Sequence, residues 1–592
     1  MSEFMLLHID LASEVIDQQE LSMDFLQEWI GGKGLGTRLL LDEVDPLIDP
    51  FDPQNKIIFV TGPLIGTSFP TANRYGILFK SPLTGTYAET YSGGSVAINM
   101  RSAGFFGIVI EGRSENPIYL CLAEGDVNFY DAGDLWGKDT FEVETILQQR
   151  HGSSAGNSSN VICIGPAGEN LVRFACVQND LYHSAGRCGA GAVMGSKNLK
   201  ALVFRGNYRT NLQEKPSFKA LTREIMKKIS NNPQVYGKHG NFQRTGTIGV
   251  VDWTNELACF PTRYFTSCQS QFKDNYDAEA MLKILVAHEG CRRCPFPCGK
   301  LVKVPDGPFS CKVMGPEYET VAAFGGICDI HDINAIAKIN EYCDRMGLDT
   351  ISAGNLCGLG IEANQRNRLS LEFPANYNDP KGILRVLDDI TYRRGIGNFF
   401  AEGITRVAQH FQLEDLAMHV KGLEFAGYDP RAFRGFALSY GVAPEGATHL
   451  RSCLYATEIH EPDRFSYENK VDKLIEAEDR MAVLDSLIVC KFLRGVLDWD
   501  ALCHIYSVIF DQPIEIPELR ELAGRVITLS REFNIVAGFG RRDDYLPDRV
   551  YLEPLFDKHG IEINLDREKY DRMLDEYYSK RGWTQDGIPI IS

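Results

Sequence analysis

Two different spacings of apolar residues divide this chain into a strand-rich first third and a helix-rich remainder. Up to about residue 205, short runs rich in β-branched residues alternate with Gly, Pro and Ser turns, which is typical of β-strands. We expect strands at Ile57–Val60, Ile108–Glu111, Ile118–Leu122, Val161–Ile164 and Ala201–Phe204. From about Asn211 onward, apolar residues recur three and four positions apart, as on one face of a helix. Helices are therefore expected at Asp277–His288, Ile333–Arg345, Ile383–Arg394, Val471–Leu487 and Pro517–Phe533.

A glycine-rich segment follows an early helical stretch. Residues Phe25–Ile30 have helical spacing and lead directly into Gly31–Gly36, which reads GGKGLG. A dinucleotide-binding loop has similar glycines, but it follows a strand and opens a helix. Because this segment follows a helix, we favour a helix C-cap and a tight turn over a dinucleotide site.

Composition and charge exclude several classes of function. The chain has 592 residues, with 44% apolar and 24% charged residues, as in an ordinary globular protein. Its net charge of −18 argues against nucleic acid or an anionic membrane as the main partner. No signal peptide and no apolar run long enough to span a bilayer is evident, so we expect a cytoplasmic protein. Most of the 16 cysteines are then expected to be reduced and packed in the core.

Three thiols are concentrated in one short loop. Cys291, Cys294 and Cys298 lie close together, and Pro295 and Pro297 stiffen the chain between them. Thiolates at this spacing can bind one soft metal centre, and an iron–sulfur cluster would need a fourth ligand from elsewhere. A structural zinc site usually has two short ligand pairs, and radical S-adenosylmethionine enzymes have the opposite cysteine spacing. We therefore favour an iron–sulfur cluster.

The strand-rich region also contains a weak internal repeat. Residues 61–66 (TGPLIG) resemble residues 164–168 (IGPAG), and an arginine and a glycine-rich turn follow each of them. In the first half these are Arg74 and Ser92–Ser95, and in the second they lie within Gly186–Gly191. Glycines let backbone N–H groups approach a phosphate, and arginine binds it with a planar fork. Two such half-sites suggest a ligand that is itself doubled, with two unrelated glycine turns as the alternative.

Longer motifs carry a resemblance to a known family. They are Thr61–Leu64, Ser81–Thr86, Gly191–Ala201, Gly315–Thr320, Asp344–Asp349 and Arg581–Trp583. In this order, and over nearly the whole chain, they resemble the aldehyde:ferredoxin oxidoreductase family of tungsten enzymes. The resemblance implies a tungsten or molybdenum bis-pterin, Mg²⁺ between the pterin phosphates, and a nearby [4Fe–4S] cluster. It also implies an α+β fold, with an N-terminal β-rich domain (1–208) as the base for the pterin cofactor and two largely helical domains (209–415 and 416–592).

The family's cofactor residues can be carried over to this sequence. The resemblance places Arg74 between pterin and cluster, and it assigns phosphate and Mg²⁺ to the turns around Tyr91, Gly93, Ala185 and Arg187. Because backbone carbonyls bind the Mg²⁺ in the family, a tyrosine at position 91 in place of the usual asparagine is compatible with this role.

Two aspartate motifs are implied to bind the amino-pyrimidine edges of the pterins, for which a carboxylate is a suitable acceptor. The first contains Asp344, Asp349 and Thr350, and the second contains Asp485. By the same resemblance, Cys490 is the fourth cluster ligand, beside Cys291, Cys294 and Cys298. The second motif departs from the family at residues 488–489, where Ile-Val replaces the usual Gly-Leu and leaves the local backbone in question.

The family's proton-transfer residues correspond to Glu319 and His449. A glutamate in a dry pocket can have a raised pKa and exchange protons near neutrality, and histidine can polarise a carbonyl. A buried structural glutamate and a core histidine are the alternatives, and the surrounding motifs favour the catalytic roles.

The resemblance also bears on partners. Arg292, Arg293, Lys300 and Lys303 surround the thiol loop on an acidic chain. We expect them to bind an acidic ferredoxin or a partner iron–sulfur subunit, with a merely solvated loop as the alternative. Some members join two subunits through iron held by a Glu-x-x-His pair, but here the two positions are Lys338 and Glu341, so that metal site should be absent. A homodimer is still compatible with the sequence, but this metal site gives no reason for one.

Together these observations predict an aldehyde ferredoxin oxidoreductase that makes carboxylic acids and passes electrons through its cluster to a carrier. One alternative is the same cofactor working as a carboxylate or aromatic acyl reductase. Another is a non-catalytic electron-transfer subunit, which the retention of Glu319, His449, Asp344 and Asp485 disfavours. The aldehyde itself, the metal and the acceptor cannot be read from the residues.

Overall fold

The first twelve strands form two six-stranded sheets. The computed structural model describes residues 3–152, 160–232, 242–461 and 463–590. The first sheet has the order β2-β1-β6-β3-β4-β5, with strands Met5–Asp10, Val15–Glu20, Ile57–Val60, Tyr75–Lys80, Tyr87–Ser92 and Gly107–Glu111 for β1 to β6. The second has the order β11-β10-β9-β12-β7-β8, with Ile118–Ala123, Asp126–Asp131, Val161–Cys163, Val177–Asn179, His183–Ala185 and Leu199–Arg205 for β7 to β12.

The two sheets have the same topology. In each, the first two strands form a hairpin, and the sixth strand returns parallel to the first, as β6 does to β1 and β12 to β7. The remaining neighbours pair antiparallel in the same sequence. The internal repeat expected from the sequence therefore corresponds to a duplicated six-strand unit. All five strands expected from the sequence are present, with ends shifted by only a residue or two.

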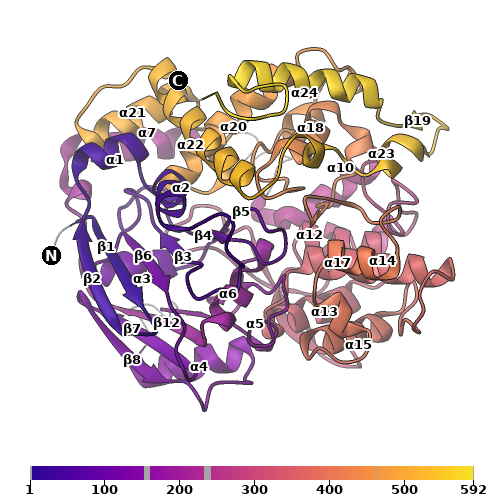
Figure 1. Cartoon of the computed structure of the whole chain (residues 1–592), viewed down its shortest axis with the longest axis horizontal. Helices are drawn as coiled ribbons and strands as arrows, with labels where there is room; N and C mark the ends of the chain where they lie inside the picture. The colour runs from indigo at the N-terminus through magenta and orange to yellow at the C-terminus, as the bar shows by residue number, and fades with distance from the viewer. Residues whose placement is uncertain (1–2, 153–159, 233–241, 462, 591–592) are drawn as a thin grey trace.

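The inner strands of the first sheet are fully buried, which explains their continuous apolar runs. Strands β3 and β4 are buried at every residue, since helix α2 (Gly32–Glu43) packs against both of them. Helices α20 (Lys470–Leu487) and α22 (Ile516–Val536) pack on the outer side of α2. The C-terminal region thus lies directly on the base, above it in Figure 1.

The glycine-rich segment is a junction between two helices. Helix α1 (Met23–Trp29) ends at Ile30, and α2 begins at Gly32, so no strand precedes the segment and a dinucleotide loop is excluded. The expected helix end and turn are present, but the second helix was not anticipated. Gly32 has a φ of +39°, and a Cβ atom there would lie 2.7 Å from Cγ1 of Ile488, so close packing on Ile488 requires glycine.

The middle region is mainly helical and lies to the right of the base in Figure 1. Its principal helices are α13 (Ile333–Met346), α14 (Thr350–Gln365), α15 (Pro380–Thr391) and α17 (Ile404–Phe411). The helix expected over Asp277–His288 is wrong in its second half. Helix α11 ends at Leu282, and Leu285–Glu289 form strand β13, because they pair with β14 (Gly299–Val304). The thiol loop joins these two strands.

The C-terminal region supplies further helices, chiefly α18 (Arg434–Val442), α21 (Trp499–Phe510) and α24 (Arg567–Arg581), beside α20 and α22. Proline lies in the first turn of α22, as expected. One continuous set of buried apolar residues runs through all three regions of the chain. Within the described residues, no helix is both long enough and apolar enough to cross a membrane.

Candidate active site and cofactor cavity

A cavity of about 2330 Å³ is lined by residues from all three regions. Its wall includes Arg74 from the base, Glu319 from α12 (Tyr318–Val321) and His449 from the segment after α18. Pockets for drug-sized ligands have volumes of about 300–1,000 Å³. This volume therefore accommodates a large cofactor together with a small substrate.

All residues predicted for the site line this cavity except Ala185 and Asp485. Ala185 is buried at the end of β11. Asp485 lies in α20 behind Arg451 and Lys491, which are themselves part of the wall. The fold thus brings the predicted site residues, which are far apart in sequence, together at the cavity. Ala185 and Asp485 lie just behind its wall.

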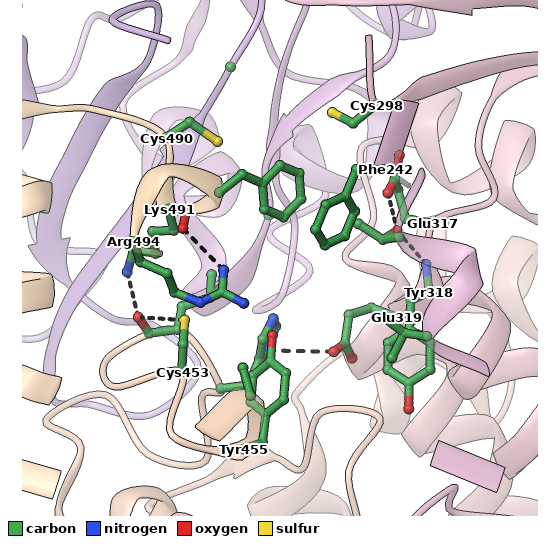
Figure 2. A pocket seen from close by; sticks show the side chains of 18 of the residues that line it. Phe242, Cys298, Glu317, Tyr318, Glu319, Cys453, Tyr455, Cys490, Lys491 and Arg494 are labelled. Atoms are coloured by element: carbon green, nitrogen blue, oxygen red, sulfur yellow. Dashed lines mark hydrogen bonds and ion pairs between the residues drawn. The ribbon is translucent and has the colours of Figure 1, made fainter. Parts of the chain in front are cut away.

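The four predicted cluster cysteines share this cavity. Figure 2 shows the sulfur atoms of Cys298 and Cys490 at the same end of it, on opposite sides. The backbone N–H of Gly94 donates to Sγ of Cys291 at 3.2 Å, and the N–H of Phe296 donates to Sγ of Cys294 at 3.4 Å. Hydrogen bonds to sulfur of this kind tune iron–sulfur clusters.

Burial raises the pKa of Cys291 to about 11 and that of Cys294 to about 12, so both thiols need a cationic ligand to become thiolates near neutral pH. No three His, Cys, Asp or Glu side chains in the described part of the chain are grouped tightly enough to hold one metal ion. Four thiols are the ligand number of a [4Fe–4S] cluster, and their binding of one stays a prediction.

Arg74 is buried beside these thiols. Burial alone would lower its pKa, but the surrounding Cys490, Cys291 and Asp485 raise it. The cysteines and Asp485 are thus close enough to Arg74 to affect its pKa, and its position between pterin and cluster stays a prediction.

Glu319 and His449 face one another in the cavity wall. Oε2 of Glu319 accepts a hydrogen bond from the N–H of Gly427 at 2.8 Å, which fixes the carboxyl. Oε1 lies 3.6 Å from Nδ1 of His449, and neither of these buried atoms has a hydrogen-bond partner among the described residues. Figure 2 shows Glu319 near Tyr455. Buried polar atoms are normally satisfied, so an unpartnered pair in a cavity points to a ligand or a reacting group.

The protonation of the two residues is set mainly by burial. Burial raises the pKa of Glu319 to about 7, and the N–H of Gly427 opposes the shift. Burial also lowers the pKa of His449 well below its usual value, with Arg187 as the next cause. The carboxyl can therefore exchange a proton near neutrality, while the imidazole stays neutral.

The first aspartate motif contributes two carboxylates with different roles. Asp349 caps helix α14, where its side chain accepts from the N–H groups of Ile351 and Ser352 at 3.1 and 3.3 Å. Asp344 is buried, and burial followed by Glu341 raises its pKa well above the usual value. Donors from a bound ligand would stabilise its ionised form, as the amino group of a pterin would do.

Arg187 lies next to this motif. Its guanidinium donates to the carbonyls of Ala447 and Glu424 at 3.0 and 2.8 Å, and its Nε lies 3.5 Å from Oδ2 of Asp349. The Nε atom has no hydrogen-bond partner among the described residues. Arg187 is thus held in place by the third region and keeps one donor for a ligand.

The two glycine half-sites meet at one edge of the base. Strands β5 and β11 are the outermost strands of their sheets, and they pack against one another. Asn179 links them by donating from Nδ2 to the carbonyl of Gly93 at 3.0 Å. This arrangement suits a ligand with two phosphates, while Mg²⁺ at Tyr91 and Ala185 stays a prediction.

A buried network of charges, which the sequence did not reveal, forms part of the cavity wall and extends behind it. Arg451 pairs with Glu445 at 2.8 Å, with Asp485 at 3.1 Å and with Glu89. Lys33, from the glycine-rich segment, also binds Glu89. A lone lysine among closely packed glycines was the one local signal of this network.

Helix α20 ends in a left-handed turn at Ile488, although residues 488–489 depart from the family pattern. Ile488 has a φ of +56°, which is unusual for a β-branched residue. It is buried against Gly32, so packing holds the conformation that the family's glycine would adopt more easily. Lys491 follows and pairs with Asp485 at 2.8 Å.

The basic cluster expected around the thiol loop has a different composition. Lys300 is only 2% exposed, and its Nζ donates to the carbonyls of Pro297 and Cys298 at 2.9 Å, so it supports the loop from inside. Burial, with Arg292 and Arg209 nearby, lowers the pKa of Arg293. Arg209, from the end of the base, thus replaces Lys300 in the exposed cluster.

At the two positions where some family members have the Glu-x-x-His pair, this chain has an ion pair. Nζ of Lys338 lies 2.6 Å from Oε2 of Glu341 on helix α13. A lysine cannot act as a metal ligand while it is charged, so this pair gives no reason for a bridging iron.

These features define a class of protein. A proton-exchanging carboxyl and a four-thiol group share a cavity sized for a large cofactor, as in redox enzymes with buried cofactors. Models of the aldehyde ferredoxin oxidoreductase family match nearly all of the chain, the N-terminal domain over residues 6–206 and domains 2 and 3 over residues 220–591. The chain belongs to this family, and membership implies a tungsten–pterin and an iron–sulfur cofactor.

Relatives share the full length of the chain but differ in their reactions. A tungsten-containing aldehyde ferredoxin oxidoreductase of Pyrococcus furiosus is 34% identical over 98% of this chain and 96% of its own. The WOR-like subunit of an aliphatic sulfonate oxidoreductase from the same organism is 28% identical, covering 99% and 95%. The BamBC active-site complex of benzoyl coenzyme A reductase, solved with 1,5-dienoyl-CoA, superposes with a TM-score of 0.84 at 23% identity, covering 99% and 95%. That likeness concerns the fold alone.

Proposed function

We propose that this protein oxidises aldehydes to carboxylic acids and passes the two electrons through a [4Fe–4S] cluster to ferredoxin or a partner iron–sulfur subunit. The overall change converts an aldehyde and water into an acid, two electrons and two protons. The observation that carries the proposal is the unpartnered contact of Glu319 and His449, 3.6 Å apart in the cavity that also contains the cluster cysteines.

The residues of this chain have distinct roles in that reaction. Glu319 accepts a proton as water adds its oxygen to the aldehyde carbon, since its pKa of about 7 allows proton exchange at neutral pH. His449 stays neutral and orients the aldehyde oxygen by hydrogen bonding. When bound, the tungsten or molybdenum bis-pterin supplies the two-electron redox step. Arg74, Arg187 and Asp344 would hold it.

The thiol loop is proposed as the route by which electrons leave. Cys291, Cys294, Cys298 and Cys490 would bind the cluster, with Arg74 between it and the pterin. Arg293, within this loop, and Arg209, near it, are both exposed, and Arg293 donates to the carbonyls of Gly66 and Thr67 at 3.1 and 2.7 Å. Exposed positive charge over the cluster of an acidic chain favours an acidic electron carrier as partner.

Anaerobic purification, metal analysis and an aldehyde screen with viologen as the acceptor test this proposal. We expect tungsten or molybdenum, roughly four irons per chain and aldehyde-dependent dye reduction. Stoichiometric zinc without pterin would contradict it. Reduction of an aromatic acyl thioester by reduced viologen, with no aldehyde oxidation, would instead identify a reductase that uses the same cofactor.

A further inference from the structure

The cavity has an aromatic wall beside the catalytic pair. The ring of Tyr428 lies 5.8 Å from the ring of His449 and stacks on Tyr455 at 4.2 Å, with 25° between their planes. Trp253, from α10 (Val250–Glu256), lies nearly parallel to both, at 6.2 and 6.4 Å. All three residues line the cavity.

The wall is partly open to the cavity. Tyr428 is only 2% exposed, whereas Trp253 and Tyr455 are half-buried, so these two rings provide the accessible surface. A second stacked pair, Phe242 and Phe492, lies at 4.5 Å in the same cavity. Figure 2 shows Phe242 between Cys298 and the catalytic residues. The space reached by a substrate is therefore bordered by flat, apolar surfaces on more than one side.

Positive charges in the outer, more exposed part of the cavity are already paired. Among the described residues, the lysines and arginines there have carboxylates within ion-pair distance, in the pairs Lys273–Asp252 at 2.9 Å, Arg244–Glu279 at 2.7 Å, Lys473–Glu461 at 2.6 Å and Arg480–Glu476 at 3.6 Å. A phosphate, a sulfonate or coenzyme A at this entrance would have to compete with these carboxylates for the positive charges. The acidic partners would also repel the incoming anion.

Two cations of the inner cavity, Arg74 beside the cluster cysteines and Arg494, have no carboxylate within ion-pair distance in the described residues. Arg494 donates to the carbonyl of Lys491 at 3.1 Å, and Figure 2 shows its guanidinium in the cavity on the side of Cys453 and Tyr455. A guanidinium plane stacks well on an aromatic ring. The guanidinium of Arg494 could equally bind an anionic group. The test therefore compares an uncharged aromatic aldehyde with anionic aldehydes.

We infer that the substrate of this site is an aldehyde whose carbonyl group is attached to an uncharged aromatic ring. The ring would lie along Trp253 and Tyr455, with Arg494 near its face, and the carbonyl would reach Glu319 and His449. The inference rests on the proposed function and deepens it, because it names the class of aldehyde. Phosphorylated, sulfonated and coenzyme A-linked substrates are disfavoured by the paired charges at the entrance.

The experiment compares aldehydes of similar size on the anaerobically purified holoenzyme. We expect kcat/KM for benzaldehyde to exceed that for cyclohexanecarbaldehyde, which is equally apolar but not planar, by about tenfold. In Trp253→Leu and Tyr455→Leu this ratio should fall towards one. Tyr130→Leu, at an exposed tyrosine of β8 that does not line the cavity, serves as the matched control and should keep the wild-type ratio.

A second measurement does not depend on turnover. Calorimetric titration should show benzoate binding more tightly than cyclohexanecarboxylate, and Trp253→Leu should remove the difference. A wild-type ratio near one, or a preference for 4-carboxybenzaldehyde or glyceraldehyde 3-phosphate over benzaldehyde, would overturn the inference while leaving aldehyde oxidation intact. Absence of oxidation with every aldehyde would instead overturn the proposed function, and the titration would still decide whether the wall binds aromatic rings.

Discussion

Oε1 of Glu319 lies 3.6 Å from Nδ1 of His449, and neither atom has a hydrogen-bond partner among the described residues. The two residues come from different regions of the chain, α12 and the segment after α18. In the cavity, the pKa of Glu319 is about 7, whereas that of His449 is well below its usual value. Near neutral pH the glutamate therefore titrates and the histidine stays neutral. Acid–base roles are commonly divided in this way.

The pH dependence of turnover should follow Glu319. Its pKa is raised to about 7, so the carboxyl is protonated below that pH and able to accept a proton above it. We expect kcat/KM for an aldehyde to rise as pH increases through about 7. Glu319→Gln should lower kcat/KM by roughly 10²–10⁴-fold and remove the rise. His449→Gln should lower the rate but keep a rise near pH 7, because the histidine does not titrate there. A rise that persists in Glu319→Gln would show that another group is the base.

Cluster assembly should depend on Cys490. Cys490→Ala removes the one proposed ligand that comes from outside the thiol loop, so iron content should fall well below that of the wild type and the cluster's paramagnetic resonance signal should disappear. Cys503→Ala is the control, since that cysteine is also partly buried but does not line the cavity. Full iron content in the Cys490 variant would contradict the proposed ligand set.

The buried charge network should matter for stability. Glu89→Gln would leave Arg451 and Lys33 without their shared carboxylate, which should cost about 3–5 kcal/mol. The expected result is a lower temperature of thermal inactivation. Glu576→Gln, which breaks an exposed pair with Lys580, should have no measurable effect. Equal inactivation temperatures for the two variants would argue against a stabilising network.

The same carboxylate has a predictable pH dependence. Burial would raise the pKa of Glu89, but Arg451 and Lys33 outweigh it and lower the pKa to about 2. A lowered folded-state pKa contributes stability above the unfolded value of 4.5, and this contribution is lost as pH falls from 4.5 towards 2. The free energy of unfolding should therefore change less with pH across this window in Glu89→Gln than in the wild type.

Electron transfer should depend on two exposed arginines, Arg293 in the thiol loop and Arg209 near it. Arg293→Glu combined with Arg209→Glu should slow the reduction of ferredoxin at low ionic strength and flatten its salt dependence. Viologen reduction should change little, because a small dye needs no docking surface. Arg542→Glu, at a highly exposed arginine elsewhere, is the control for net charge. Wild-type ferredoxin kinetics at low salt in the double variant would exclude this surface.

Local patterns were informative wherever one element determines its own structure. The strands of the base, the helix with Pro517 in its first turn and the concentration of cysteines could all be read from spacing alone. Patterns failed where a distant segment decides the outcome. Residues Leu285–Glu289 have helix-like spacing, but pairing with β14 makes them a strand. Lys300 has the composition of a surface charge, yet backbone carbonyls surround it.

The sequence by itself therefore determined the family, the strand-rich base with its repeat, and the residue types available for a cluster and for proton transfer. These features follow from short-range spacing and from motifs that stay together along the chain. Only the tertiary structure decided that Glu319 and His449 face each other unpartnered, that Asp485 is held by Arg451, and that aromatic rings line the cavity beside them. Those relationships depend on contacts between residues separated by long stretches of chain, which no local pattern specifies.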